Sequence, residues 1–404
     1  MVVGIIGAGA SGMTAALWAA QNPNVQVILM ERQGRVGRKL QATGNGRCNL
    51  SNAKFHISHY HGEDPAFAKQ IFSQFGVEDT LNWFSNLGLC TVTEDSGKIY
   101  PHSDQANSVV DVLRLALNKE NISLRLGYDV EKIKLSPDGF AIQSRDETVF
   151  CDRLIVACGG LAGTKLGGTM AGYKLLSRLG HRSTKLRPNL VQIQSSFKAL
   201  PSLKGVRANC NVEILHNGER FAQSRGELQF TEQGLSGPVI FEISRDVCAA
   251  SGKWLARLDL LPQWSEEKVL AHLKSRVEQN YPVEDILTGV LHNRLGRVLT
   301  QCAGIKGKAC CRDLSESELA ELCRCVKALE VELTEPMGME NAQVTAGGVI
   351  TDDFDPNTLE SKKIPGLYVC GELLDVDGDC GGYNLQWAWS SGCIAGRNAG
   401  KETK

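Results

Sequence analysis

The first 31 residues contain the pattern that most restricts the fold of this chain. An apolar run at 2–6 is followed by the glycine turn G-A-G-A-S-G at 7–12 and by an alanine-rich stretch at 13–20. The sequence Asn22-Pro23 breaks that stretch, and a second apolar run at 25–30 ends at Glu31. This order predicts a buried strand, a helix and a second buried parallel strand, which is the βαβ unit of dinucleotide-binding folds.

The spacing of the glycines predicts how this unit binds a nucleotide. Gly7 permits the tight turn, Gly9 lets the backbone approach a pyrophosphate, and Gly12 permits close packing of helix and strand. The helix N-terminus supplies amide donors and a favourable dipole. Glu31 lies nineteen residues beyond Gly12, where a carboxylate can accept hydrogen bonds from ribose hydroxyls, and its charge disfavours a 2′-phosphate. The pocket is therefore predicted to hold FAD or NAD rather than NADP.

Two further glycine-rich segments favour FAD over NAD. The basic stretch 37–49, which includes G-R-K-L and T-G-N-G-R-C-N, follows the ribose acid and could wrap phosphate and the edge of a larger ring system. Near the other end, Gly371-Glu372 follows a strand, and G-G-Y-N-L-Q at 381–386 opens the last helix. A helix N-terminus beneath the pyrimidine side of a flavin would stabilise negative charge at N1 and O2 upon reduction. The sequence therefore predicts FAD, held by segments from both ends of the chain.

Several motifs together resemble those of a known flavoprotein family. The chain resembles, over nearly its whole length, the family called aminoacetone-oxidase-like or 3-dehydro-bile-acid Δ4,6-reductase-like. Two positions depart from the family pattern: no proline follows Gly159-Gly160, and Ala171 stands where Asp is frequent. The matching motifs are those at 7–12, 44–52, 100–103 (Y-P-x-S), 226–231 (G-E-L-Q-F-T), 234–238 (G-x-S-G-P), 344–349 (V-T-x-G-G-V) and 381–386.

The resemblance implies an α/β fold and a set of cofactor contacts. The fold is a Rossmann-type, glutathione-reductase-like FAD domain with an inserted β-rich domain and a small helical domain. The expected domains are 1–189 (first part of the FAD domain), 190–262 (β-rich substrate domain), 263–335 (helical insertion) and 336–404 (second part of the FAD domain). The implied FAD-binding residues are Gly7, Gly9, Ala10, Ser11, Gly12, Glu31, Arg32, Lys39, Gly44, Asn45, Gly46, Arg47, Cys48, Asn49, Val130, Gly159, Gly160, Gly371, Glu372, Gly382, Tyr383, Asn384, Leu385 and Gln386.

Local patterns predict further elements of the first part. The pattern from 67 to 86 is helical, and an amphipathic helix is expected at 108–119. Three antiparallel strands are expected at 128–135, 139–145 and 148–150, the first two joined by the turn S-P-D-G. Such a meander before the returning strand at 153–157 is typical of large flavin domains.

No residue stands out as catalytic. Tyr100 and His102 lie in a motif that matches the family and could donate a proton to substrate, although loop packing explains them equally well. Cys48 is the one thiol inside a cofactor segment. Because it has no nearby C-x₂-C or C-x₄-C partner, packing against the flavin is a better explanation than disulfide chemistry.

Three metal-like patterns do not support a metal site, and no metal is expected. The D-x-D-x-D sequence at 375–379 resembles a calcium loop, but the positions of the loop glycine and bidentate glutamate fall on Cys380 and Gln386. The cysteines at 310–311 and 323–325 lack the C-x₂-C spacing of common zinc sites. The histidines between 56 and 61 lie in a polar stretch, so solvated loop histidines are expected there.

Composition limits the compartment and the partners. The 14 cysteines would indicate disulfides only in an oxidising compartment. The N-terminal apolar stretch has no basic residue ahead of it and is interrupted by glycines, which makes it a poor secretory signal, so the cytoplasm and reduced thiols are expected. The net charge of −1 gives no general attraction to nucleic acid or to anionic membranes. We therefore expect a small-molecule substrate, no nucleic acid and no membrane; the oligomeric state stays open.

The reaction expected from the resemblance is the reduction of an activated C=C, such as a steroid-like enone, by hydride transfer through flavin N5. NAD(P)H is the expected donor, as a transient visitor, because the chain has no second G-x-G-x-x-G unit. The same observation leaves open a flavin amine oxidase of the aminoacetone type that uses O₂. A third alternative, of another class, is an RNA-associated or macromolecule-binding flavoprotein, although acids and bases are mixed in the segment 265–329.

Overall fold

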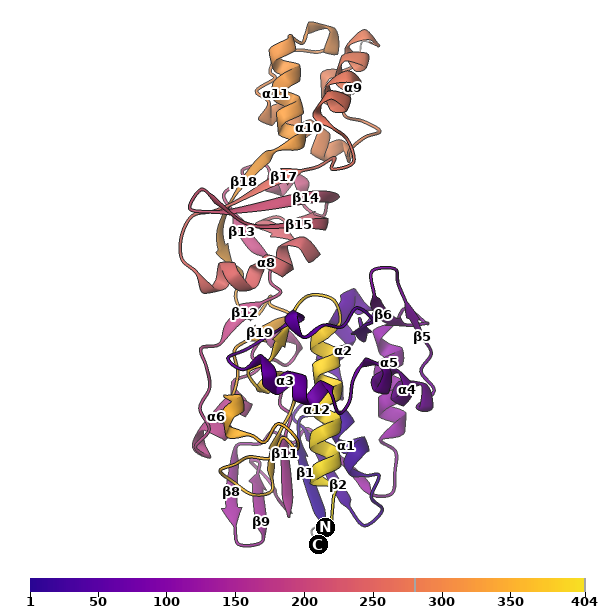
Figure 1. The fold of residues 1–404 in the computed structure, drawn as a ribbon, viewed down its shortest axis with the longest axis vertical. Helices are drawn as coiled ribbons and strands as arrows, with labels where there is room; N and C mark the ends of the chain where they lie inside the picture. The colour runs from indigo at the N-terminus through magenta and orange to yellow at the C-terminus, as the bar shows by residue number, and fades with distance from the viewer. Residues whose placement is uncertain (280, 403–404) are drawn as a thin grey trace. The chain divides into compact units, whose positions relative to one another are not determined.

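The computed structural model describes residues 1–279 and 281–402 and divides the chain into two units (Figure 1). The discontinuous unit consists of Met1–Asn189 and Met339–Lys404, and the inserted unit consists of Leu190–Gly338. The two ends of the chain therefore belong to one unit, as the FAD prediction requires.

A five-stranded parallel sheet forms the centre of the discontinuous unit, in the order β20-β11-β1-β2-β7. Strands β1, β2, β11 and β20 are largely apolar and buried, because a parallel sheet is covered on both faces, whereas the edge strand β7 is mostly exposed. The predicted βαβ unit at the N-terminus is confirmed. The elements are β1 (Val2–Ile6), α1 (Ala10–Ala19), β2 (Gln26–Glu31), β7 (Ile122–Leu126), β11 (Arg153–Val156) and β20 (Leu367–Val369).

The last helix, α12 (Tyr383–Ala399), packs along α1 on glycines spaced by four (Figure 1). A Cβ atom on Gly392 would lie 2.5 Å from the carbonyl oxygen of Ser11, and one on Gly396 would collide with that of Ala15. Because 392 meets 11 and 396 meets 15, the two helices run parallel. Because α12 starts nine residues before Gly392 and α1 starts one residue before Ser11, the N-terminus of α12 extends past that of α1 by about eight residues, or about 12 Å. We call this contact the α1–α12 seam.

The remaining elements of the discontinuous unit surround this sheet. The expected meander is present as β8, β9 and β10, which pair antiparallel. The single helix expected at 67–86 is wrong: two helices form, and Gly76 begins the second, with its N–H donating to the Asp79 carboxylate at 2.8 Å. The elements are α2 (Arg38–Ala42), β3 (Ser51–Asn52), β4 (Tyr60–His61), α3 (Pro65–Phe72), α4 (Val77–Asn86), β5 (Thr91–Thr93), β6 (Lys98–Pro101), α5 (Ala106–Ala116), β8 (Lys132–Ser136), β9 (Gly139–Gln143), β10 (Thr148–Cys151), α6 (Ala171–Arg178), β12 (Arg187–Asn189), β19 (Val344–Ala346) and β21 (Asp377–Gly378).

The inserted unit contains a closed six-stranded barrel, in the order β13-β16-β15-β14-β17-β18, and a group of helices. The final strand alternates buried and exposed residues, with Leu329, Val331 and Leu333 facing inward. The barrel and the helices share one hydrophobic core. The elements are β13 (Ile193–Ser195), α7 (Leu200–Leu203), β14 (Arg207–His216), β15 (Glu219–Phe230), β16 (Gly234–Ser236), α8 (Pro238–Ala249), β17 (Trp254–Asp259), α9 (Glu266–Glu278), α10 (Asn293–Cys302), α11 (Glu316–Lys327) and β18 (Leu329–Pro336).

The division into four domains stays a prediction, and the structure adds one fact to it. β18 lies in the segment 263–335 that was expected to be helical, yet it pairs with β17 and β13 and so closes the barrel built by the preceding segment. Among the described residues, no helix combines the length and the apolar character needed to cross a membrane.

Candidate functional site

The glycine turn between β1 and α1 uses its glycines in two different ways. A Cβ on Gly7, whose φ is +102°, would lie 2.5 Å from the Ala157 carbonyl oxygen, and one on Gly12 would collide with the Gly7 carbonyl. Gly9 begins α1 with ordinary backbone angles, and a Cβ there would have no heavy atom within 4 Å. Gly7 and Gly12 are thus required by packing, whereas Gly9 faces open space at a helix N-terminus. The helix amides beside that space lack partners within the helix and suit a phosphate.

The predicted ribose acid is fixed beside the same turn. The Glu31 carboxylate accepts the N–H of Ala8 at 2.8 Å and the N–H of Gln33 at 2.9 Å, one on each oxygen. Next to it lies a polar cavity of about 290 Å³. Arg32 lines this cavity, and so does Asp129, which directly precedes the buried Val130. Its lining residues are Arg32, Gln33, Arg38, Asp129, Thr164 and Gly167.

The loop that follows α2 is wound in the left-handed conformation. Gly44, Asn45, Gly46 and Cys48 have φ values of 58°, 56°, 85° and 61°. Two of these residues are not glycine, and each such position costs about 1–3 kcal/mol, a strain that is usually found where a ligand is bound. Just beyond the loop, the Oδ1 atom of Asn49 is buried and has no hydrogen-bond partner among the described residues. A buried acceptor of this kind suits a donor from a bound ligand.

A charged pair joins the early and late segments of the discontinuous unit. The Lys39 ammonium lies 2.7 Å from a carboxylate oxygen of Glu372, whose other oxygen accepts the N–H of Thr345 at 2.9 Å. The Thr345 hydroxyl in turn accepts the N–H of Ala162 at 2.9 Å. A Cβ on Gly160 would collide with both the Thr345 hydroxyl and a Glu372 oxygen, the latter at 2.5 Å. Sequence reasoning missed Thr345, although the V-T-x-G-G-V motif contains it.

The polar side chains at the start of α12 make hydrogen bonds to other parts of the protein. Gly382 precedes the helix with a φ of 98°. The Asn384 amide accepts the N–H of Gly378 at 2.8 Å and donates to its carbonyl at 2.7 Å. The Gln386 amide is buried, accepting from Ser51 and donating to Thr80 at 2.8 Å. Leu385 is partly buried in the main core. The backbone of Gly371 is engaged as well, because its N–H donates to the Ser391 hydroxyl and its carbonyl accepts from the Trp387 indole. Contact between these residues and FAD stays a prediction.

The three weak catalytic candidates differ in their surroundings. Burial raises the pKa of the Cys48 thiol to about 12, so this group is not a ready nucleophile. The Arg47 guanidinium lies 3.9 Å from the centre of the Tyr100 ring and pairs with the carboxylates of Glu94 and Asp104. His102 is exposed. None of the three is assigned a role by these contacts.

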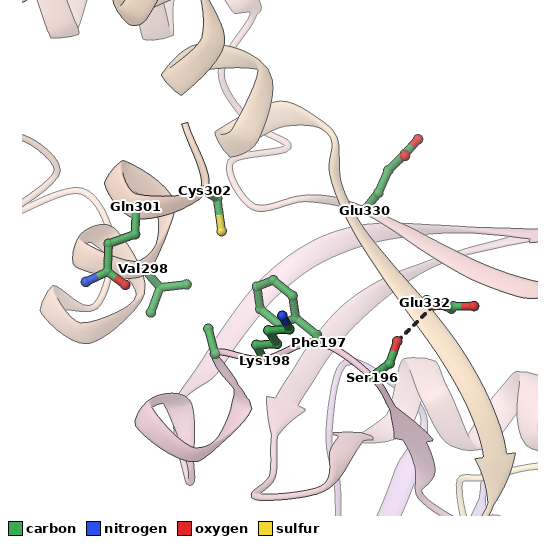
Figure 2. A pocket seen from close by; sticks show the side chains of 9 residues that line it. Ser196, Phe197, Lys198, Val298, Gln301, Cys302, Glu330 and Glu332 are labelled. Carbon is green, nitrogen blue, oxygen red and sulfur yellow. Dashed lines mark hydrogen bonds between the residues drawn. The ribbon is translucent and has the colours of Figure 1, made fainter. Parts of the chain in front are cut away.

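The larger cavity, of about 440 Å³, lies within the inserted unit and does not suit a nucleotide (Figure 2). Its lining contains no glycine and combines two carboxylates, Glu330 and Glu332, with a single cation, Lys198. Glu332 accepts a hydrogen bond from the Ser196 hydroxyl at 2.9 Å. Among the described residues, no group of three or more His, Cys, Asp and Glu side chains could hold a metal ion. The features that suit a nucleotide lie in the discontinuous unit.

The residues of the discontinuous unit fit FAD. FAD is an extended dinucleotide with a pyrophosphate at its centre and a flavin ring at one end. Three features match this shape: the open space at Gly9, the buried Asn49 oxygen that has no partner among the described residues, and the offset, parallel N-termini of α1 and α12. This fold and site define an FAD-dependent oxidoreductase with a Rossmann-type domain.

Comparisons with known proteins give the family. The chain belongs to the HI0933-like family, since the model described as "HI0933-like protein Rossmann domain" matches residues 1–398. It is 40% identical, over 403 residues and 98% of both chains, to a 3-dehydro-bile acid delta(4,6)-reductase of Clostridium scindens. It is 32% identical over 387 residues to a ribosomal RNA dihydrouridine synthase of Escherichia coli, covering 96% of this chain and 95% of that one. A solved E. coli quinol fumarate reductase mutant shares the fold, with a TM-score of 0.51 and 15% identity over 99% of this chain and 70% of that chain. The family resemblance predicted from the motifs is confirmed.

Proposed function

We propose that this flavoprotein reduces a C=C bond conjugated to a carbonyl in a small, steroid-like substrate, with NAD(P)H as electron donor. The observation that supports this most is the 40% identity with the delta(4,6)-reductase over 98% of both chains. Dihydrouridine synthesis, the activity named for the second relative, is the same kind of reaction, because the uracil C5=C6 bond is conjugated to a carbonyl. Both reactions place hydride on the carbon distant from the carbonyl and a proton on the nearer carbon.

Bound FAD would supply the hydride through N5, and the chain would supply position and charge. The N-terminus of α1 would hold the pyrophosphate, and that of α12 would stabilise negative charge on the pyrimidine side of the ring. The ion pair of Lys39 and Glu372 joins the early and late segments that would meet at the cofactor. The single G-x-G-x-x-G turn fits a nicotinamide nucleotide that visits and leaves.

A second candidate is the reduction of uridine in ribosomal RNA, which the 32% identity with the E. coli enzyme favours. We place it second because the identity is lower and because the net charge of −1 offers little general attraction to RNA.

Anaerobic mixing of the FAD-loaded protein with NADH or NADPH tests the proposal. We expect the flavin absorbance to bleach and then to return upon addition of a 3-oxo-4-ene steroid, with formation of the saturated ketone. Return of colour only with a ribosomal RNA fragment would favour the second candidate. A flavin that neither nucleotide bleaches, but that an amine reduces and O₂ reoxidises, would overturn the reductase in favour of an oxidase.

A further inference from the structure

Two histidines share one carboxylate just ahead of α12. The Asp379 carboxylate lies 2.9 Å from His59 Nδ1 through Oδ2 and 2.6 Å from His61 Nε2 through Oδ1. The pairing of β4 with β21 brings them together, and the Asp379 N–H donates to the His59 carbonyl at 2.9 Å. The three side chains are 36%, 31% and 33% exposed in the order His59, His61 and Asp379, so each has a solvent-facing and a buried part. We call this group the histidine–aspartate triad.

Each ring of the triad keeps one nitrogen available. Among the described residues, His59 Nε2 and His61 Nδ1 have no hydrogen-bond partner, whereas the opposite nitrogen of each ring is bonded to Asp379. Burial alone would raise the pKa of Asp379, but the hydrogen bonds from His61 and His59 outweigh it and hold that pKa below its ordinary value. The ionised carboxylate therefore orients both rings, and each ring can give or take a proton at its other nitrogen.

The triad is held against the first residue of α12. The His59 ring stacks on the Tyr383 ring, with centroids 4.3 Å apart and planes 20° apart. The Tyr60 hydroxyl donates to the Tyr383 carbonyl at 3.0 Å, which fixes the strand that contains His61 to the same residue. The triad is thus attached to the helix end that the FAD hypothesis places at the flavin ring.

The other ionisable side chains near the start of α12 include two tyrosines and two aspartates. Burial raises the pKa of both Tyr60 and Tyr383, so these phenols stay neutral near pH 7. Asp377 is buried and accepts a hydrogen bond from Asn189 at 2.8 Å, and Asp375 is buried and accepts the N–H of Glu63. Of the described groups packed around the start of α12, the two histidines each keep one ring nitrogen free of hydrogen bonds to described residues.

We propose that the histidine–aspartate triad supplies the proton of the reduction, an inference that rests on the proposed function. Hydride supplied by bound, reduced FAD would form a C–H bond at the β-carbon, and the π electrons of the C=C bond would move toward the carbonyl to give an enolate. The α-carbon then takes a proton that the triad delivers, and a solvent proton restores the ring. One hydride and one proton add across the double bond, and the electrons come from NAD(P)H.

The kinetic test separates the two half-reactions in stopped flow. General acid catalysis contributes about 10²–10⁴-fold. We therefore expect His59→Ala to slow reoxidation of the flavin by the enone about 100-fold, while reduction by NAD(P)H stays within about twofold. Added imidazole should restore part of the lost rate, which a purely structural defect would not allow. The matched control is His56→Ala, because His56 is exposed and its ring is bonded to Ser58 alone among the described residues.

A second measurement does not depend on activity. Imidazole ¹⁵N spectra above about pH 8, where an ordinary histidine is neutral, should show the proton on Nδ1 of His59 and on Nε2 of His61. Asp379→Asn should abolish this pair of opposite tautomers and also slow reoxidation. It serves as the second variant if His59→Ala fails to fold.

The outcomes distinguish the two proposals. A wild-type protein that cannot reduce any enone overturns the proposed function and this inference with it. If the wild-type protein reduces an enone, and the flavin reoxidation rates of His59→Ala and Asp379→Asn are both within threefold of the wild-type rate, the inference alone is overturned.

Discussion

The glycines of the α1–α12 seam and those around the predicted cofactor space look alike in sequence but have opposite surroundings. Gly392 and Gly396 face backbone atoms of α1 so closely that a Cβ would collide or lie within 2.5 Å. Gly9, Gly46 and Gly159 face no heavy atom within 4 Å of where a Cβ would lie. The first set is explained by packing of the protein alone, whereas the second set leaves room in which a ligand could lie. The comparison separates glycines that packing requires from glycines that packing does not explain.

The largest effect is expected in the seam. Gly396→Ala should destabilise the discontinuous unit by about 3 kcal/mol, because the new Cβ meets the rigid Ala15 carbonyl and the helices must move apart. Denaturant unfolding of the FAD-free protein measures this. Gly34→Ala is the control, since a Cβ at Gly34 meets nothing within 4 Å. Equal stability of Gly396→Ala and the control would break the comparison.

Gly9→Ala should leave the stability of the protein unchanged but weaken FAD binding. The protein should fold with wild-type stability, because its Cβ meets no protein atom and its φ of −80° suits alanine. Affinity for FAD should fall about 100-fold, or about 2.7 kcal/mol, since the Cβ would occupy the approach of the pyrophosphate. Titration of the apoprotein by flavin fluorescence measures the change. Unchanged affinity would mean that the pyrophosphate does not lie at this turn.

A smaller effect is expected at the charged pair. Lys39→Met keeps the length of the side chain but leaves the Glu372 carboxylate without its ammonium partner at 2.7 Å. Charge-assisted hydrogen bonds are worth about 1.5–3 kcal/mol, so we expect FAD to bind about tenfold more weakly. Lys39→Arg, which retains the charge, should lose less. Isothermal titration shows the difference, and a loss of stability without any loss of affinity would assign the pair to the fold alone.

The smallest effect is expected at Cys48. Because burial raises its pKa to about 12, this thiol should resist iodoacetamide at pH 8, while the exposed Cys90 reacts. Peptide mass spectrometry of the folded protein reads both sites. Cys48→Ala should leave flavin reduction and reoxidation rates close to those of the wild type. Rapid labelling of Cys48 would show that the left-handed loop opens, and would return this residue to the list of catalytic candidates.

Local patterns predicted the parts of the fold that depend on neighbouring residues. The βαβ unit and the meander were found because apolar runs, turn residues and glycines lie close together in the chain. β18 was not found: its partners β13 and β17 are distant in sequence, and the charged residues around it suggested a helix. The break at Gly76 was missed because the apolar spacing continues across it.

The candidate site was predictable to a similar extent. The glycine turn and Glu31 have a fixed spacing, so their proximity could be inferred, and the motif at 381–386 correctly indicated a helix start. The triad could not be inferred. His59 and His61 lie about 320 residues from Asp379 along the chain, at separations of 320 and 318, and were interpreted as solvated loop residues. Only pairing of β4 with β21 brings the three together.

The parallel arrangement of α1 and α12 sets an order of events during synthesis. Translation makes the glycine turn at 7–12 well before α12, which begins about 370 residues later. A growing chain that has not reached Tyr383 possesses one of the two helix N-termini and none of the seam. Retention of FAD should therefore begin only once α12 has been made and the seam has formed.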